Sequence, residues 1–241
     1  MNAPEPTTMP IPCIDAQNLP VRTMLSAVSH DVSSPIKAAI GFANLLRSRI
    51  EEKLDKEELR WLGLISTEAQ RAQSMLGGLS TFSNLMVAPL TPVKIDLENL
   101  LFSIGKRHPC TLNIESLPQI EGDMTQWRQF LDELISNAIR FRSPDRPLSL
   151  HVRWRQDNSQ GVLQIVDNGI GVNEKDLVRM VLPFFRTQQI ADPPDPGTGM
   201  GMGLAYCDQI LKRHGGSLSF SANADHGLTV NCHLPHAMFG T

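Results

Sequence analysis

The sequence has few cysteines and no excess of positive charge. Its four cysteines, Cys13, Cys110, Cys207 and Cys232, lie far apart, and no two of them form a CxxC pair. They therefore predict neither a zinc site nor a disulfide framework, and scattered thiols of this kind suit a reducing compartment. The formal net charge is −3, whereas a sequence-independent nucleic-acid binder needs a strongly basic surface, so we expect no nucleic-acid partner.

Long apolar runs are also missing. No stretch approaches the ~18 consecutive apolar residues that cross a bilayer. The opening stretch MNAPEPTTMPIPC has neither the basic nor the apolar region of a signal peptide. We therefore predict a cytoplasmic protein that makes no membrane contact. A hydrophobic fraction of 41% in 241 residues is enough for a real core, and the length favours one or two domains.

Hydrophobic periodicity divides the chain into a flexible tail (1–18), a helical hairpin (19–90) and a mixed region (91–241). Apolar residues recur at steps of three and four along both helices of the hairpin. The two sets are Leu25, Val28, Val32, Ile36, Ala39, Ala43, Leu46 and Ile50, then Leu62, Ile65, Ala69, Ala72, Leu76, Leu79, Ser83 and Met86, in which Ser83 is the one polar interruption. One hairpin leaves part of such a stripe uncovered, so we predict a homodimer through 19–90 that forms a four-helix bundle. The alternative is a hairpin that packs on the rest of its own chain.

The mixed region predicts an α/β sandwich, which makes the whole chain α+β. Short runs typical of β-strands cover 149–154, 162–166, 217–221 and 229–233. Helical runs cover 123–141, 174–180 and 204–214. Elements of both kinds, separated by tight glycine turns, favour helices on one face of a mixed sheet.

His30 is a candidate nucleophile on the first helix. At about 100° per residue it falls opposite the apolar set, so we expect its imidazole to face solvent. Asp31 follows directly, and a carboxylate beside an imidazole can hold the proton of one ring nitrogen and raise the reactivity of the other. By itself, an exposed histidine is more often an ordinary surface residue.

A second candidate site begins on the helical run 123–141. Glu133, Asn137 and Arg140 are spaced i, i+4 and i+7, so they share one helix face. An acid, an amide and a cation together can bind a metal–phosphate group, because Mg²⁺ prefers oxygen ligands and arginine neutralises phosphate oxygens. The alternative is a solvated charged face.

Two glycine-containing motifs follow this helix. Asp167-Asn168-Gly169-Ile170-Gly171 comes directly after a strand, where one carboxylate can meet a ligand's amino group, although a plain turn has the same sequence. The segment GTGMGMGL (197–204) opens the last helix, and its backbone N–H groups can approach phosphates. It is not a P-loop, since no Gly-Lys-Ser/Thr follows. A glycine loop without a ligand is the alternative.

These motifs together resemble a known family. The stretch Ser29–Ile36 (SHDVSSPI) resembles the H box of two-component sensor histidine kinases, at the start of a HisKA-type dimerisation and phosphoacceptor hairpin. The three later motifs look like the N box and the two glycine boxes of the Bergerat-type (GHKL) ATP-binding fold, and Pro183–Arg186 is similar to its F box. The resemblance covers about residues 21 to 236, with the motifs in the family's order.

The resemblance implies a role for each matching residue. His30 would accept the phosphoryl group, Asp31 would orient or deprotonate it, and Ser34 would help to position water for dephosphorylation of a regulator. The ATP-binding set would be Glu133, Asn137, Arg140, Phe141, Asp167, Gly169, Gly171, Thr198, Gly199, Gly201, Gly203 and Leu204. Within this set, Asn137 and Glu133 would hold Mg²⁺, and Asp167 would read the amino group of adenine. The segment 187–196 would be the lid over the nucleotide.

The resemblance further implies a response regulator receiver domain as the partner. We recognise no sensor domain before the hairpin, so we expect either that a separate sensory polypeptide delivers the signal or that the tail before Val21 contacts a partner. Glu133 departs from the family, because kinases usually have Asn there and the gyrase-like branch uses an acid to activate water. Two alternatives therefore stay open. One is a histidine phosphotransferase or adaptor with a degenerate ATP lobe, and the other is a GHKL ATPase that uses Glu133.

Overall fold

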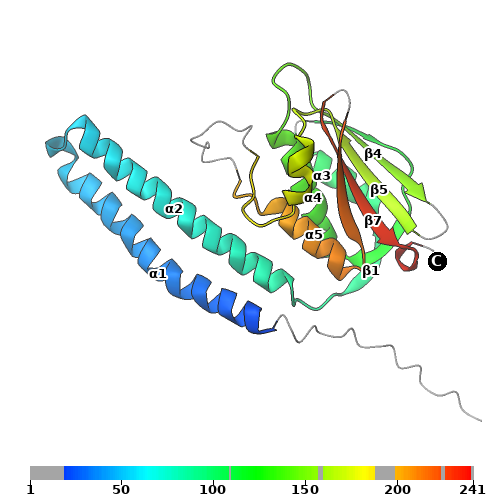
Figure 1. The fold of residues 1–241 in the computed structure, drawn as a ribbon, viewed down its shortest axis with the longest axis horizontal. Coiled ribbons are helices and arrows are strands. Elements are labelled where there is room, and N and C mark those ends of the chain that lie inside the picture. The colour runs from blue at the N-terminus through cyan, green and yellow to red at the C-terminus, as the bar shows by residue number, and fades with distance from the viewer. Residues whose placement is uncertain (1–18, 109, 157–159, 188–198, 224–225, 240–241) are drawn as a thin grey trace, which may run out of the picture. The chain divides into compact units, whose positions relative to one another are not determined.

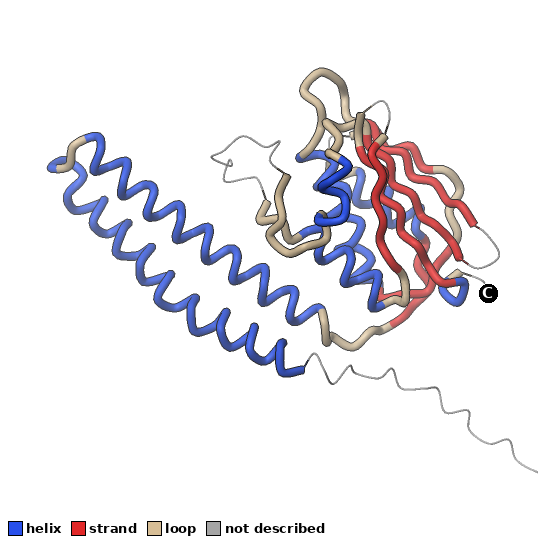
Figure 2. Tube along the Cα trace, viewed as in Figure 1, coloured by secondary structure: helices blue, strands red, loops and turns tan. Residues whose placement is uncertain are grey.

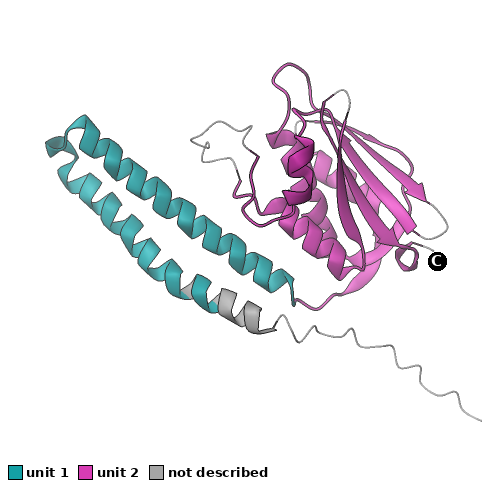
Figure 3. Cartoon of the chain, viewed as in Figure 1, with its two compact units in different colours: residues 1–87 teal, residues 88–241 magenta. Residues whose placement is uncertain are grey.

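The chain divides into two compact units, Met1–Val87 and Ala88–Thr241 (Figure 3). The computed structural model describes residues 19–108, 110–156, 160–187, 199–223 and 226–239. Inside the first helix, the side chains of residues 19–26 and 30 are outside the described part. The predicted flexible tail, residues 1–18, lies outside it as well. Each unit is described by itself.

The first unit is a helical hairpin (Figure 1). It consists of α1 (Leu19–Ile50), a short 3₁₀ turn (Glu51–Lys53) and α2 (Lys56–Leu85). Asp55 caps the start of α2, because its carboxylate accepts from the backbone N–H groups of Glu57 and Glu58, both at 2.8 Å. The Glu58 carboxylate accepts from the N–H of Asp55 at 2.9 Å, which completes a capping box.

The hairpin does not cover its own apolar stripe. Ala43 of this stripe is buried, but Leu46 and Ile65 are 50% and 53% exposed. The large apolar side chains of the hairpin that stand exposed are Val28, Val32, Phe42, Leu45, Leu46, Trp61, Leu64 and Ile65. Within the described residues of this unit, an apolar face is therefore left open to solvent.

The second unit is built on a five-stranded mixed sheet with the order β2-β4-β5-β7-β6. The strands are β2 (Thr111–Ile114), β4 (Ser149–Gln156), β5 (Gln160–Asp167), β7 (Leu228–Pro235) and β6 (Ser217–Ala222). β2 and β4 are parallel, and the other neighbours are antiparallel. A separate antiparallel pair joins β1 (Pro92–Asp96) to β3 (Gln119–Asp123).

Three helices lie on one face of the five-stranded sheet (Figures 1 and 2). They are α3 (Leu97–Gly105), α4 (Met124–Arg140) and α5 (Gly203–Arg213). The core between the layers includes Trp127, Phe130, Leu131, Ile135, Leu150, Val152, Leu163, Ile165, Ile210, Leu211 and Cys232, all at most 3% exposed. Alternate strand residues supply this core, as a sheet with one buried face requires.

The opposite face of the sheet is polar. Arg153 on β4 donates to the side chain of Gln164 on β5 at 2.8 Å, and Gln164 donates to Asn231 on β7 at 2.6 Å. The predicted α+β class, with helices on one face of a mixed sheet, is thereby confirmed.

Some elements differ from the prediction. The segment expected as a helix over 174–180 is a 3₁₀ helix, Glu174–Arg179, and it buries none of its residues, so no apolar face stabilises a longer α-helix. The elements β1, α3, β2 and β3 were not predicted. In the part of the chain that the structure describes, no helix combines the length and the apolar character needed to cross a membrane.

Candidate functional site

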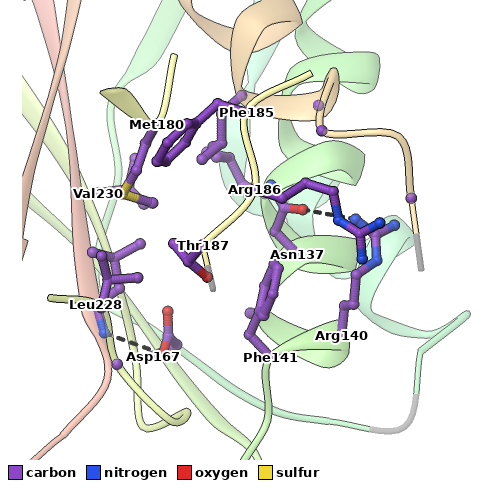
Figure 4. A pocket seen from close by; sticks show the side chains of 18 residues that line it. Asn137, Arg140, Phe141, Asp167, Met180, Phe185, Arg186, Thr187, Leu228 and Val230 are labelled. Carbon is purple, nitrogen blue, oxygen red and sulfur yellow. Dashed lines mark hydrogen bonds between the residues drawn. The ribbon is translucent and has the colours of Figure 1, made fainter. Parts of the chain in front are cut away.

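A pocket in the second unit lies between the end of α4, the turn after β5 and the start of α5 (Figure 4). The predicted site residues that line it are Asn137, Arg140, Phe141, Asp167, Gly171, Gly199, Gly201, Gly203 and Leu204. Glu133 and Gly169 lie just outside this lining, and Thr198 lies outside the described residues. Three motifs that lie far apart in the sequence therefore meet in one place.

Helix α4 presents the first polar group of the pocket. Its N-cap, Asp123, accepts from the backbone N–H of Gln126 at 3.0 Å, which fixes where the helix begins. The apolar face of the helix is buried and includes Leu134 and Ala138. Asn137 faces the pocket near the helix end, and its amide oxygen accepts from Nη1 of Arg140 at 3.2 Å.

The glycines of the 197–204 segment let the polar groups of α4 come close. A Cβ atom on Gly199 would lie 2.7 Å from Nη1 of Arg140, and one on Gly203 would lie 2.6 Å from Oε2 of Glu133. A larger residue at either position would displace a charged side chain. Gly203 also opens α5, so the Glu133 carboxylate lies beside the positive end of a helix dipole.

Glu133 is a half-buried carboxylate with a perturbed pKa. Burial raises its pKa; nearby Arg140 lowers it and neighbouring Asp132 raises it, with a net increase. The oxygens of Glu133 and Asn137, one helical turn apart, are the type of ligand that Mg²⁺ takes, so these residues fit that ion. No group of three or more His, Cys, Asp or Glu side chains suited to a metal occurs among the described residues, so phosphate and water oxygens would have to complete the shell.

Asp167 presents a carboxylate from the end of β5. Its Oδ1 accepts from the backbone N–H of Gly169 at 2.8 Å and from that of Leu228 at 3.2 Å. Burial raises the pKa of Asp167 and these two hydrogen bonds lower it, with a net increase. Figure 4 shows the carboxylate pointing into the pocket between Leu228 and Phe141. An oriented, desolvated carboxylate of this kind can accept a hydrogen bond from a ligand's amino group.

Several functional residues were missed by the sequence reasoning. The Asn223 side chain donates to the carbonyl oxygen of Asp167 at 3.2 Å and accepts from the Thr229 hydroxyl at 2.6 Å. The apolar walls of the pocket include Leu134, Ala138, Val172, Met180, Leu228 and Val230. No local signal marks Asn223, Leu228 or Val230, because their place depends on strand register and on contacts between distant segments.

The candidate residues of the hairpin belong to the first unit. His30 lies within α1, but the expected exposure of its imidazole concerns a side chain outside the described part. Asp31 and Ser34 are exposed on the same helix. The expected lid is described only at Thr187, which lines the pocket.

A helical hairpin joined to an α/β sandwich with this pocket defines a class of ATP-dependent signalling proteins. Residues 21–86 match the family described as the His Kinase A (phospho-acceptor) domain. Residues 122–238 match the family described as histidine kinase-, DNA gyrase B- and HSP90-like ATPase. The chain therefore belongs to the histidine kinase family.

Known proteins resemble the chain over most of its length. The phosphate regulon sensor protein PhoR of Pseudomonas aeruginosa is 27% identical over 227 residues, which are 90% of this chain and 50% of PhoR. The chain thus spans half the length of that relative. The crystal structure of full-length ShkA in complex with AMPPNP has the same fold (TM-score 0.61, 20% identity, 90% of this chain and 46% of that one). The Acinetobacter baumannii histidine kinase AdeS shares it too (TM-score 0.54, 20% identity, 86% and 97%).

Proposed function

We propose that the chain is an ATP-dependent protein-histidine kinase of two-component signalling. It transfers the γ-phosphoryl group of ATP to His30 and then to an aspartate on the receiver domain of a response regulator. In our proposal, residues 19–90 form the dimerisation and phosphotransfer domain, and residues 91–241 form the catalytic domain. One observation carries the proposal. Residues 21–86 match a phospho-acceptor domain, and the same chain contains a pocket for a nucleotide. In that pocket the oriented carboxylate of Asp167 faces a glycine segment and the cationic end of a helix.

In this proposal, one set of pocket residues contacts the adenine base and another set contacts the phosphates. Asp167 accepts a hydrogen bond from the adenine amine, and Phe141 lies beside the base. Arg140 and the backbone around Gly199, Gly201 and Gly203 neutralise and position the phosphates. Asn137 and Glu133 would hold Mg²⁺, which supplies further charge neutralisation when bound. The AMPPNP complex of ShkA, a protein of the same fold, supports ATP as the nucleotide.

The hairpin supplies the acceptor. A neutral imidazole nitrogen of His30 attacks the γ-phosphorus, the bond to the β–γ bridging oxygen breaks, and ADP leaves. Asp31 holds the proton on the other ring nitrogen and stabilises the cation that forms. Ser34, one turn further along α1, helps to position water for regulator dephosphorylation.

The exposed apolar face of the hairpin supports the predicted homodimer, because a second copy of that face would cover it. The receiver domain as partner belongs to the same proposal, which the phospho-acceptor match supports. The cytoplasmic location, the absence of membrane and nucleic-acid contacts, and a separate sensory polypeptide stay predictions.

Autophosphorylation of the full chain with γ-labelled ATP tests the proposal. We expect label that survives base and is lost in acid, as a phosphoramidate requires, and its loss in His30→Ala. The matched control is His151→Ala, because His151 is an exposed histidine on β4 away from the pocket lining. Label that persists in His30→Ala would show that the acceptor is wrong, and a chain that does not bind ATP with Mg²⁺ would favour the adaptor.

Glu133 favours a second candidate function, ATP hydrolysis. Its carboxylate lies against Gly203, and burial raises its pKa, so it is suited to take a proton from water. A hydrolase would release phosphate at an unchanged rate in His30→Ala and at a strongly reduced rate in Glu133→Gln. A kinase that uses Glu133 only for the metal would lose autophosphorylation in Glu133→Gln and would release little phosphate in either variant.

A further inference from the structure

Arg146 lies in the loop between α4 and β4 and contacts the turn that follows β5. Its Nε donates to the carbonyl oxygen of Asn168 at 2.8 Å, and its Nη2 donates to that of Gly169 at 3.2 Å. The side chain is half-buried and is not part of the pocket lining. Because a guanidinium donates both bonds, they belong to the stronger, charge-assisted class. One side chain therefore holds two consecutive peptide groups of the turn.

The first of these peptide groups also holds the Asp167 carboxylate. A trans peptide is planar, so its carbonyl and its N–H point in opposite directions. The peptide group between Asn168 and Gly169 makes two hydrogen bonds. Its carbonyl, on Asn168, accepts from Arg146, and its N–H, on Gly169, donates to Oδ1 of Asp167 at 2.8 Å. Any rotation of this peptide away from Arg146 would turn the N–H away from the carboxylate.

The second peptide group ties the turn to the end of α4. Its carbonyl, on Gly169, accepts from Arg146, and its N–H, on Ile170, donates to the carbonyl oxygen of Phe141 at 2.9 Å. The space there is tight, since a Cβ atom on Gly169 would lie 2.5 Å from that same oxygen. Arg146 thus fixes the position of Asp167 relative to Phe141. Both residues line the pocket, and Figure 4 shows them on opposite sides of it.

We infer that Arg146 is a positioning residue for base recognition: through the Asn168–Gly169 peptide it aims Asp167, so that the pocket prefers a purine with an amino group at C6. The inference rests on the proposed role of Asp167. It predicts a selective effect, because Arg140, which is proposed to meet the phosphates, bonds to Asn137, whereas Arg146 bonds to the turn after β5. Loss of Arg146 weakens binding of an amino purine and spares a purine nucleotide without that amine.

The test compares the affinities of ATP and ITP, whose base has a carbonyl in place of the amine. We expect wild type to prefer ATP, and Asp167→Ala to lose that preference. Arg146→Ala should lose about tenfold in ATP affinity, the usual size for a hydrogen bond to a charged group, and change ITP affinity less than about twofold. Arg146→Ala added to Asp167→Ala should cost no further selectivity, since both act through one carboxylate. The matched control is Arg142→Ala, an exposed arginine that donates to its own helix end and should keep wild-type selectivity.

The outcomes separate the inference from the proposed function. A wild-type chain that binds neither nucleotide contradicts the proposed function itself. If Asp167→Ala loses the preference and Arg146→Ala keeps it, or if Arg146→Ala weakens ATP and ITP equally, the inference is wrong. Arg146→Lys covers the case of an unfolded alanine variant. Lysine keeps the cation but has one nitrogen in place of the planar guanidinium, and Asn168 still bonds to Pro147 and Ser149. With a melting temperature near wild type, Arg146→Lys must show a smaller preference for ATP, or the inference fails.

Discussion

Two half-buried carboxylates, Asp167 and Glu133, are held differently at the proposed nucleotide site. Asp167 accepts two backbone hydrogen bonds, which offset part of its desolvation, whereas the positive charge of Arg140 offsets part of the desolvation of Glu133. The first arrangement suits a carboxylate that recognises a base, because its orientation is fixed. The second suits a carboxylate that binds a cation or takes up a proton, because Arg140 compensates its negative charge only partly until the ligand binds.

Glu133→Gln should therefore raise the stability of the free protein. Burial raises the folded-state pKa of Glu133, so the folded state prefers the protonated form, and stability is lost as the pH rises through that folded pKa. Glutamine removes the cost, and we expect a melting temperature about 2 °C higher at pH 8, with a gain that shrinks as the pH falls toward 5. Thermal denaturation of both proteins over this range, without nucleotide, measures it. A lower melting temperature at pH 8 would mean that the carboxylate has a stabilising partner in the folded chain.

At the residue scale, the sequence predicted the polar residues that line the pocket better than the residues that hold them in place. Asn137, Arg140 and Asp167 follow recognisable local patterns, so the residues could be chosen without coordinates. Arg146 and Asn223 could not, because their hydrogen bonds to the Asp167 turn span 22 and 56 residues of chain. Such contacts depend on the strand register, which no pattern around either residue specifies.

At the scale of single elements, length separates the predicted elements from the missed ones. The helices of the hairpin and α4 have 32, 30 and 17 residues and were expected, whereas the missed helix α3 has nine. β2 has four residues and none of them is buried, while β1 begins at Pro92 and pairs with β3 alone. Short edge strands of this kind carry little hydrophobic alternation, so composition alone does not reveal them.

The capping box of α2 gives a prediction for one helix. Asp55→Ala removes the side chain that accepts from Glu57 and Glu58, and it should lower the free energy of unfolding of the hairpin by about 1 kcal/mol. Denaturation followed by far-UV circular dichroism measures the change, with Glu52→Ala, an exposed acid in the preceding turn, as the control. ATP affinity should stay at the wild-type value, because the pocket lies within the second unit. Equal losses of stability in Asp55→Ala and Glu52→Ala would show that Asp55 stabilises the hairpin through its charge alone and not through its hydrogen bonds to the start of α2.

At the scale of the whole molecule, the two units differ in how fully they bury their apolar side chains. The second unit closes its own core, with helices on the apolar face of the sheet and a polar network on the other face. The first unit consists of two helices, and two helices cannot enclose a stripe as wide as the one that the sequence predicts. The apolar side chains that this unit leaves exposed therefore favour self-association.

We expect the wild-type chain to be a dimer, and replacement of Leu46 and Ile65 together by Glu to make it a monomer. Both side chains are about half exposed on the hairpin, and two buried charges per chain would make the bundle core unstable. Sedimentation equilibrium should give twice the chain mass for wild type and the chain mass for the double variant, with ATP affinity changed less than about twofold. The control is Phe102→Glu, an apolar residue of α3 that is 59% exposed in the second unit, and it should leave the dimer intact. A double variant that still sediments as a dimer, or a Phe102→Glu protein that becomes monomeric, would show that the association surface lies outside the hairpin.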